Sequence, residues 1–144
     1  MAKGRPLKSI FMGTTKVAAE KTAMEIQSVL VASGARQIAT DYDPQGKIRG
    51  LRFCLHVNGR DHAFALPVRT DTLVKHCRGD RAQAERVAWR QLLRWTQAQM
   101  AMIDVGMVQP AEVYAPYLLR PGGHTLFEEM LEHQLKALPA PASV

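Results

Sequence analysis

The chain has 144 residues, of which 47% are hydrophobic, and 19 Lys and Arg against 13 Asp and Glu give it a formal net charge of +6. That length is typical of one domain, and the hydrophobic share is sufficient for a core. Two cysteines exclude a disulfide framework, and no apolar run approaches the roughly 20 residues of a membrane span. We therefore expect a cytoplasmic protein with reduced thiols and no membrane partner.

The charge is distributed unevenly along the chain. Residues 104–144 contain two basic and five acidic side chains, whereas residues 1–16 contain no acid and four basic side chains, Lys3, Arg5, Lys8 and Lys16. A basic segment favours an anionic partner, either nucleic acid or an acidic protein surface. We interpret residues 1–13 as a basic flexible arm, residues 14–138 as a single α+β domain and residues 139–144 as a disordered tail.

The first half of the domain is predicted to be a helix followed by strands. Ala23, Ile26 and Leu30 recur at helical spacing, and Gly34 is a typical stop signal, which together predict a helix over residues 19–33. QIATDY predicts a first strand, and the alternating apolar pattern of residues 48–57 predicts a second. The intervening DPQGK has the Pro and Gly of a turn.

Asn58 and Gly59 predict a two-residue type I′ hairpin between the second strand and a third. Such a turn fixes the register, which we expect to be Val57 opposite Arg60, Leu55 opposite His62, Phe53 opposite Phe64 and Leu51 opposite Leu66. The other face of the sheet would carry a mixture suited to contact with water: Arg52, Cys54, His56, Asp61, Ala63 and Ala65.

The second half of the domain is predicted to be helical. DTLVKHC predicts a short helical turn, and Gly79-Asp80 opens a long helix over about residues 81–104. Pro110 opens a short helix, and Thr125 with Glu128 forms a capping box for the last one. The expected fold class is α+β in the order α-β-β-β-α, an antiparallel three-stranded meander with helices packed on one face, plus two short C-terminal helices.

The long helix contains the stretch ERVAWRQLLRW, in which three arginines fall four residues apart. A helical wheel places the two tryptophans, Trp89 and Trp95, on a wide apolar arc, and predicts that both pack in the core with Leu92, Phe53 and Phe64. A separate stripe lies roughly opposite that arc and consists of Gln83, Arg86, Arg90, Arg94 and Gln97. A stripe without acids suits phosphate or carboxylate, and the alternative is a solvated face. On either interpretation, replacing the three arginines with glutamine should leave the fold intact.

Other polar residues do not assemble into recognisable chemistry. Cys54 and His56 share a strand face, but zinc needs four ligands in near-tetrahedral geometry, and neighbouring strand positions do not aim a base at a nucleophile. We therefore expect no metal, no cofactor and no catalytic residues, and hence a protein that is not an enzyme.

Several stretches taken in order carry a resemblance: EKTAMEIQSVLVASGA, GLRF, FALP, AERVAWRQLLRW and PYLLRPGGHTLFEEM. Together they resemble short uncharacterised proteins encoded by bacterial phages, prophages and other mobile elements, over about residues 14–130. The resemblance implies a phage or mobile-element setting and carries over no activity. The order α-β-β-β-α is also similar, at the level of fold, to double-stranded-RNA-binding domains, although DRAQAER stands where those domains carry lysines.

These observations favour a small accessory protein that binds nucleic acid with little sequence preference. The expected contacts are the stripe Gln83, Arg86, Arg90, Arg94 and Gln97, together with Arg52 and the arm residues Lys3, Arg5 and Lys8. The alternative is a protein-interaction module, an inhibitor or adaptor that docks on a host or phage protein through the same stripe or a free sheet edge. The sequence does not distinguish DNA, RNA and protein partners, and does not indicate an oligomeric state.

Overall fold

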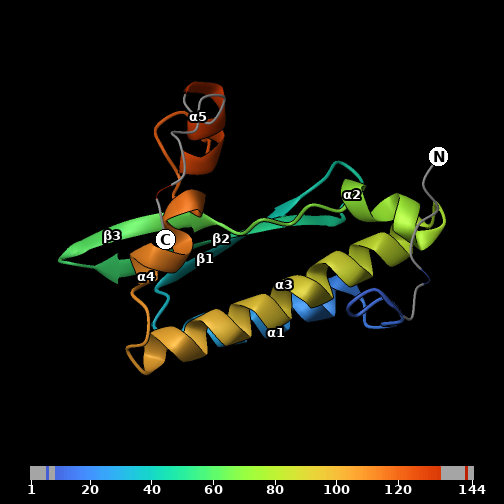
Figure 1. Ribbon diagram of the computed structural model, residues 1–144, viewed down its shortest axis with the longest axis horizontal. Helices are drawn as coiled ribbons and strands as arrows, with labels where there is room; N and C mark the ends of the chain where they lie inside the picture. Colours follow the sequence, from blue (N-terminus) through green and yellow to red (C-terminus); the bar gives the residue numbers. More distant parts are fainter. Residues whose placement is uncertain (1–5, 7–8, 134–141, 143–144) are drawn as a thin grey trace.

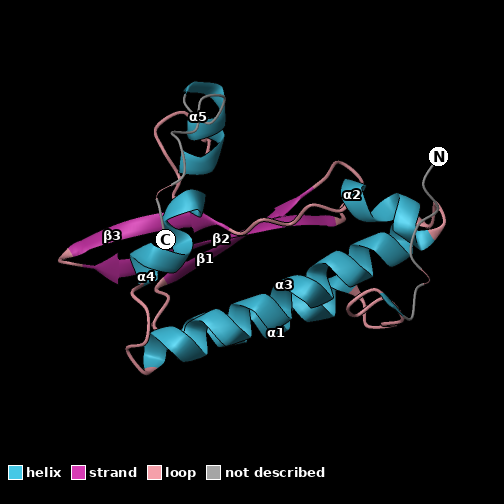
Figure 2. Cartoon of the chain, in the orientation of Figure 1, coloured by secondary structure: helices cyan, strands magenta, loops and turns pink. Residues whose placement is uncertain are grey.

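The computed structural model describes residue 6, residues 9–133 and residue 142, and consists of a three-stranded sheet laid against a pair of long helices (Figures 1 and 2). The helices are α1 (Ala19–Ala32), α2 (Asp71–Val74), α3 (Arg81–Asp104), α4 (Pro110–Tyr114) and α5 (Leu126–His133), and the strands are β1 (Gln37–Tyr42), β2 (Ile48–Val57) and β3 (Arg60–Ala65). This order confirms the predicted α+β class.

Helices α1 and α3 run parallel, side by side, beneath the sheet (Figure 1). Three polar contacts, whose residue numbers increase along both helices and the residues flanking them, establish the direction. Gln83 bonds to the backbone of Thr15, Arg90 to Thr22, and Asp104 accepts from Ser33. Two neighbouring parallel helices need a connection that brings the chain back to the end where the first helix began. The three strands between α1 and α3 provide this connection.

The sheet has the order β1-β2-β3 and is antiparallel throughout. The predicted hairpin register is confirmed, with Phe53 opposite Phe64, and a bond from the Leu66 amide to the Leu51 carbonyl at 2.9 Å continues it past β3. Asn58 and Gly59 both have positive φ, 52° and 81°, as a type I′ turn requires. Because register fixes the faces, the apolar side chains of β2 all point at the helices.

The two edges of the sheet differ. The Leu119 amide donates to the Ala63 carbonyl at 2.8 Å, and Leu118 bridges to Phe64, so the C-terminal segment pairs with the outer edge of β3. No segment among the described residues pairs with the outer edge of β1. One edge of the sheet is therefore covered by the chain itself and the other is open.

The core lies between the sheet and the α1–α3 pair. Trp89 is 1% exposed and Phe53 1%, and the half-buried Trp95 packs edge-to-face on Tyr114 at 5.6 Å between ring centroids. Trp89, Leu92, Phe53 and Phe64 belong to one cluster with Trp95 packed against it, which confirms the prediction of a shared core. Neither tryptophan lies on the arginine side of α3.

Tyr114 at the end of α4 is fully buried among Phe53, Phe64 and Trp95, and its hydroxyl has no hydrogen-bond partner among the described residues. Burial raises the pKa of this phenol. A buried hydroxyl without a partner costs about 1 kcal/mol or more, so we expect Tyr114→Phe to leave the free energy of unfolding unchanged or to raise it by about 1 kcal/mol. Urea unfolding followed by circular dichroism measures this, and a clear loss of stability would show that the hydroxyl has a partner.

The N-terminal segment departs from the sequence interpretation. Residues 9–13 were expected to belong to a flexible arm, but Ile10 packs against a second small cluster of Cys77, Ala84 and Val87, and Gln91 donates to the Phe11 carbonyl at 2.9 Å. The apolar Ile10 anchors this segment on α3, so the packed chain begins earlier than residue 14.

The C-terminal helix α5 begins with the predicted capping box. The Glu128 amide donates to the Thr125 hydroxyl at 3.2 Å, and the Glu128 carboxylate accepts from the Thr125 amide at 3.0 Å. In Figure 1 this helix stands away from the α1–α3 pair, beyond the sheet. Across the described part of the chain, every helix is too short or too polar to cross a membrane.

Candidate nucleic-acid interface

The predicted stripe begins at Gln83 and Arg86, which act as a unit. The Gln83 side-chain nitrogen donates to the carbonyls of Gly13 and Thr15, at 2.9 and 3.0 Å, and so ties the N-terminal segment to α3. The Gln83 side-chain oxygen accepts from Nε and Nη2 of Arg86, at 2.9 and 2.7 Å. The guanidinium of Arg86 is therefore held in place by a neutral amide and keeps its full positive charge.

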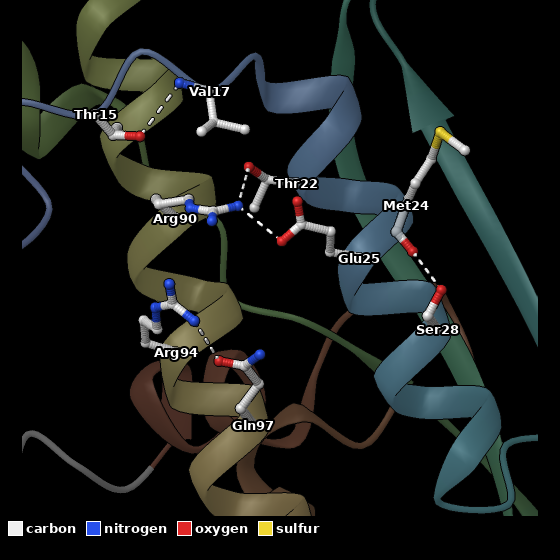
Figure 3. Close-up of polar contacts among 9 residues, drawn as sticks. All are labelled: Thr15, Val17, Thr22, Met24, Glu25, Ser28, Arg90, Arg94 and Gln97. Atoms are coloured by element: carbon white, nitrogen blue, oxygen red, sulfur yellow. Dashed lines mark hydrogen bonds and ion pairs between the residues drawn. The ribbon is translucent and has the colours of Figure 1, made fainter.

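Arg90 does not belong to a solvated stripe. Its side chain is 14% exposed, and Nη1 donates to the Glu25 carboxylate at 2.8 Å and to the Thr22 hydroxyl at 3.3 Å (Figure 3). The expectation that all three arginines face solvent or a partner is thus wrong at this position. Arg90 lies in the seam between α3 and α1, where an acid from the other helix neutralises it.

Arg94, one turn further along α3, is exposed and bonds through Nη1 to the side-chain oxygen of Gln97 at 2.9 Å (Figure 3). Its arrangement repeats that of Arg86 and Gln83, since a glutamine three residues away orients the guanidinium without cancelling its charge. Arg86 and Arg94 thus share one kind of bonding partner, although Arg86 is half-buried and Arg94 is exposed, whereas Arg90 between them bonds to an acid.

Arg52 is exposed on the open face of the sheet, as expected, but its charge is compensated. Its Nε and Nη2 form a two-point bond to the Asp41 carboxylate across the β1–β2 ladder, at 3.0 and 2.9 Å. Arg49, Arg81 and Arg120 likewise pair with Asp43, Asp71 and Glu129. These four arginines face acids, which distinguishes them from Arg86 and Arg94.

The arm residues Lys3, Arg5 and Lys8 lie outside the described residues. The chain that follows them is described, and its contacts with Gln83 and Gln91 place it along the first half of α3. It bonds to Gln91 through Phe11 and to Gln83, the partner of Arg86, only at Gly13 and Thr15.

Sequence reasoning missed Glu25 and Lys21. Glu25 lies on α1 on the side facing α3, and the exposed Lys21 lies one helical turn before it. We use the term basic face for Lys21 of α1 together with Arg86, Arg90 and Arg94 of α3. A wheel of each helix alone could not bring these residues together, because their meeting depends on the parallel packing.

The residues weighed for catalysis or metal binding make local structural contacts. His56 Nδ1 lies 2.8 Å from the Asp61 carboxylate, which is its cross-strand neighbour and whose pKa this contact lowers. The Cys54 thiol lies 3.9 Å from the Gln37 side-chain oxygen. Within the described ranges, no three His, Cys, Asp or Glu side chains gather closely enough to hold a metal ion.

Comparisons with protein-family models, with curated proteins and with solved structures found no match to this chain.

Proposed function

We propose that this protein binds nucleic acid with little sequence preference through the basic face, with Arg86 and Arg94 as its principal phosphate contacts. The observation that supports the proposal is the difference in partners along α3. Arg86 and Arg94 are oriented by glutamine oxygens, whereas Arg90 is neutralised by Glu25.

A guanidinium held by an amide combines an uncompensated charge with a defined direction. A guanidinium paired with a carboxylate must lose that partner before it can neutralise a phosphate, so it releases few counterions. A guanidinium held by an amide keeps both its charge and a defined direction, which lowers the entropy cost of contact. Arg90 then acts as a positioning residue that locks α1 against α3, and α3 itself fixes the spacing of Arg86 and Arg94.

The biological setting is also a proposal. The resemblance to phage and mobile-element proteins supports a role as a small cytoplasmic accessory protein in such a system. The basic residues Lys3, Arg5 and Lys8 would add further non-specific phosphate contacts.

Fluorescence anisotropy with single- and double-stranded DNA and RNA tests the proposal. We expect binding to more than one of the four, similar affinity for unrelated sequences, and an affinity that falls linearly on a plot of log K against log salt. Absence of binding to all four at low salt would refute the proposal.

The second candidate is a protein-interaction module. It is favoured by the open edge of β1 and by the apolar side chains Met24 and Val31, which are 66% and 61% exposed. This role predicts a stoichiometric complex with a host or phage protein that survives nuclease treatment. If every retained partner disappears with nuclease, this second role fails.

A further inference from the structure

The open edge of β1 lacks the usual protection of an edge strand. Edge strands are commonly blunted by lysine, proline or an uncompensated charge, and QIATDY contains neither lysine nor proline. Its one acid, Asp41, is held by Arg52 on the open face of the sheet. The row of backbone groups along β1 is therefore accessible to another strand.

A strip of α1 formed by Met24, Gln27, Ser28 and Val31 flanks this open edge. Met24 and Val31 are 66% and 61% exposed and line a groove of about 700 Å³, whose other lining residues are Lys21, Glu25, Gln27, Ser28 and Ala32. Figure 3 shows Met24 and Ser28 on the side of α1 away from Arg90, so α3 does not cover them. The Gln27 side chain donates to the Thr40 hydroxyl at 3.2 Å, which places the middle of this strip level with the middle of β1.

We propose that two copies of this chain associate through β1, antiparallel about a twofold axis near Thr40, so that their two sheets become one continuous sheet. A twofold axis perpendicular to the sheet keeps the helices of both copies on the same face. The two α1 helices then become antiparallel neighbours across the axis.

The helix strip is complementary to itself under this symmetry. Gln27 lies level with Thr40 and therefore close to the axis, and Met24 and Val31 lie on either side of it. Rotation brings Met24 of each copy toward Val31 of the other, so the same apolar contact forms twice. The pairing covers two large side chains that the single chain leaves in water.

A second copy satisfies the open strand and the helix strip with a single axis, which an unrelated peptide strand would not do. Asp41 and Asp43, at the end of β1, are already paired within the chain with Arg52 and Arg49 and take no part in this contact.

Analytical ultracentrifugation of the full chain without nucleic acid tests the association. We expect the mass to rise from the monomer value of 16.0 kDa toward twice that value as the concentration rises into the hundreds of micromolar. A monomer throughout this range would overturn the proposal. Because no nucleic acid is present, the result does not depend on the proposed function.

Two matched double variants locate the interface. Met24→Glu with Val31→Glu should keep the chain monomeric at concentrations where the wild type is dimeric, because four acids would meet at the axis. The control, Val105→Glu with Met107→Glu, changes side chains that are 73% and 67% exposed beyond α3, and should dimerise like the wild type. Circular dichroism checks that both are folded, and a dimer unaffected by the Met24 and Val31 changes would overturn the proposed interface.

A disulfide experiment tests the antiparallel arrangement separately. In a Cys54→Ala background, a Met24→Cys chain is mixed with a Val31→Cys chain and oxidised, and mass spectrometry counts the products. We expect the mixed disulfide to exceed both homodimeric disulfides well beyond the statistical ratio, since residue 24 faces residue 31 across the axis. A statistical mixture, or an excess of either homodimer, would contradict the arrangement.

Discussion

Replacing Trp89 with alanine is expected to lower the free energy of unfolding by about 3–5 kcal/mol, the cost typical of deleting a large buried aromatic side chain. Trp89 is 1% exposed and lies in the main cluster between the sheet and the α1–α3 pair. In this cluster the Trp89 side chain packs with apolar residues of the strands and of α1. Urea unfolding followed by circular dichroism measures the loss.

Trp95 provides the comparison for this experiment. It packs on Tyr114 and Tyr117 at 5.6 and 5.7 Å between ring centroids, but it is only partly buried. Trp95→Ala should therefore cost less than Trp89→Ala. Equal stability of the wild type and the Trp89→Ala variant would mean that the core does not pass through this residue.

Arg90→Ala is expected to destabilise the fold by about 1–2 kcal/mol, because it removes a largely buried side chain and leaves the Glu25 carboxylate, which is 37% exposed and therefore partly hydrated, without its charged partner. Glu25 would lose its 2.8 Å bond, and the buried hydroxyl of Thr22 would lose its 3.3 Å contact. The control is Arg94→Ala, which removes an exposed side chain bonded to exposed Gln97 and should change stability by less than about 0.5 kcal/mol.

A double-mutant cycle separates the ion pair from other effects of the Arg90 change. Arg90→Ala and Glu25→Ala should together cost clearly less than the sum of the two single changes, because each single change already breaks the pair. Additive costs would show that the two side chains do not interact in solution. Because Arg90 bonds to Glu25, replacing Arg86, Arg90 and Arg94 together with glutamine should lower the stability of the fold, contrary to the prediction from the helical wheel.

Much of the fold could be predicted from the sequence because the signals are local. Asn58-Gly59 determines a turn type, the turn determines the register, and the register determines which side chains of β2 meet the helices. The long helix between Asp80 and Gly106 is likewise bounded by residues whose capping roles are readable one at a time. Each of these predictions depends on residues within a few positions of one another.

The candidate site could be predicted only in part because its decisive contact is not local. Arg86, Arg90 and Arg94 look equivalent on a helical wheel, and the acid that distinguishes Arg90 comes from 65 residues earlier in the chain. The same reason applies to Leu119, whose bond to Ala63 covers one sheet edge, and to Ile10, which anchors the N-terminal segment. Such pairings follow from how the elements pack, which no single-element pattern encodes.

We expect Arg86 and Arg94 to contact phosphate and the arginines paired with acids to make no such contact. Replacing Arg86 and Arg94 together with glutamine should weaken binding to all nucleic-acid sequences alike and shrink the salt slope by up to about two phosphate contacts, at roughly 0.9 each for duplex DNA. The matched control replaces Arg52 and Arg120, which pair with Asp41 and Glu129, with glutamine. This control removes as much positive charge as the Arg86 and Arg94 variant, and we expect its salt slope to be close to that of the wild type. Equal salt slopes for the two double variants would contradict the claim.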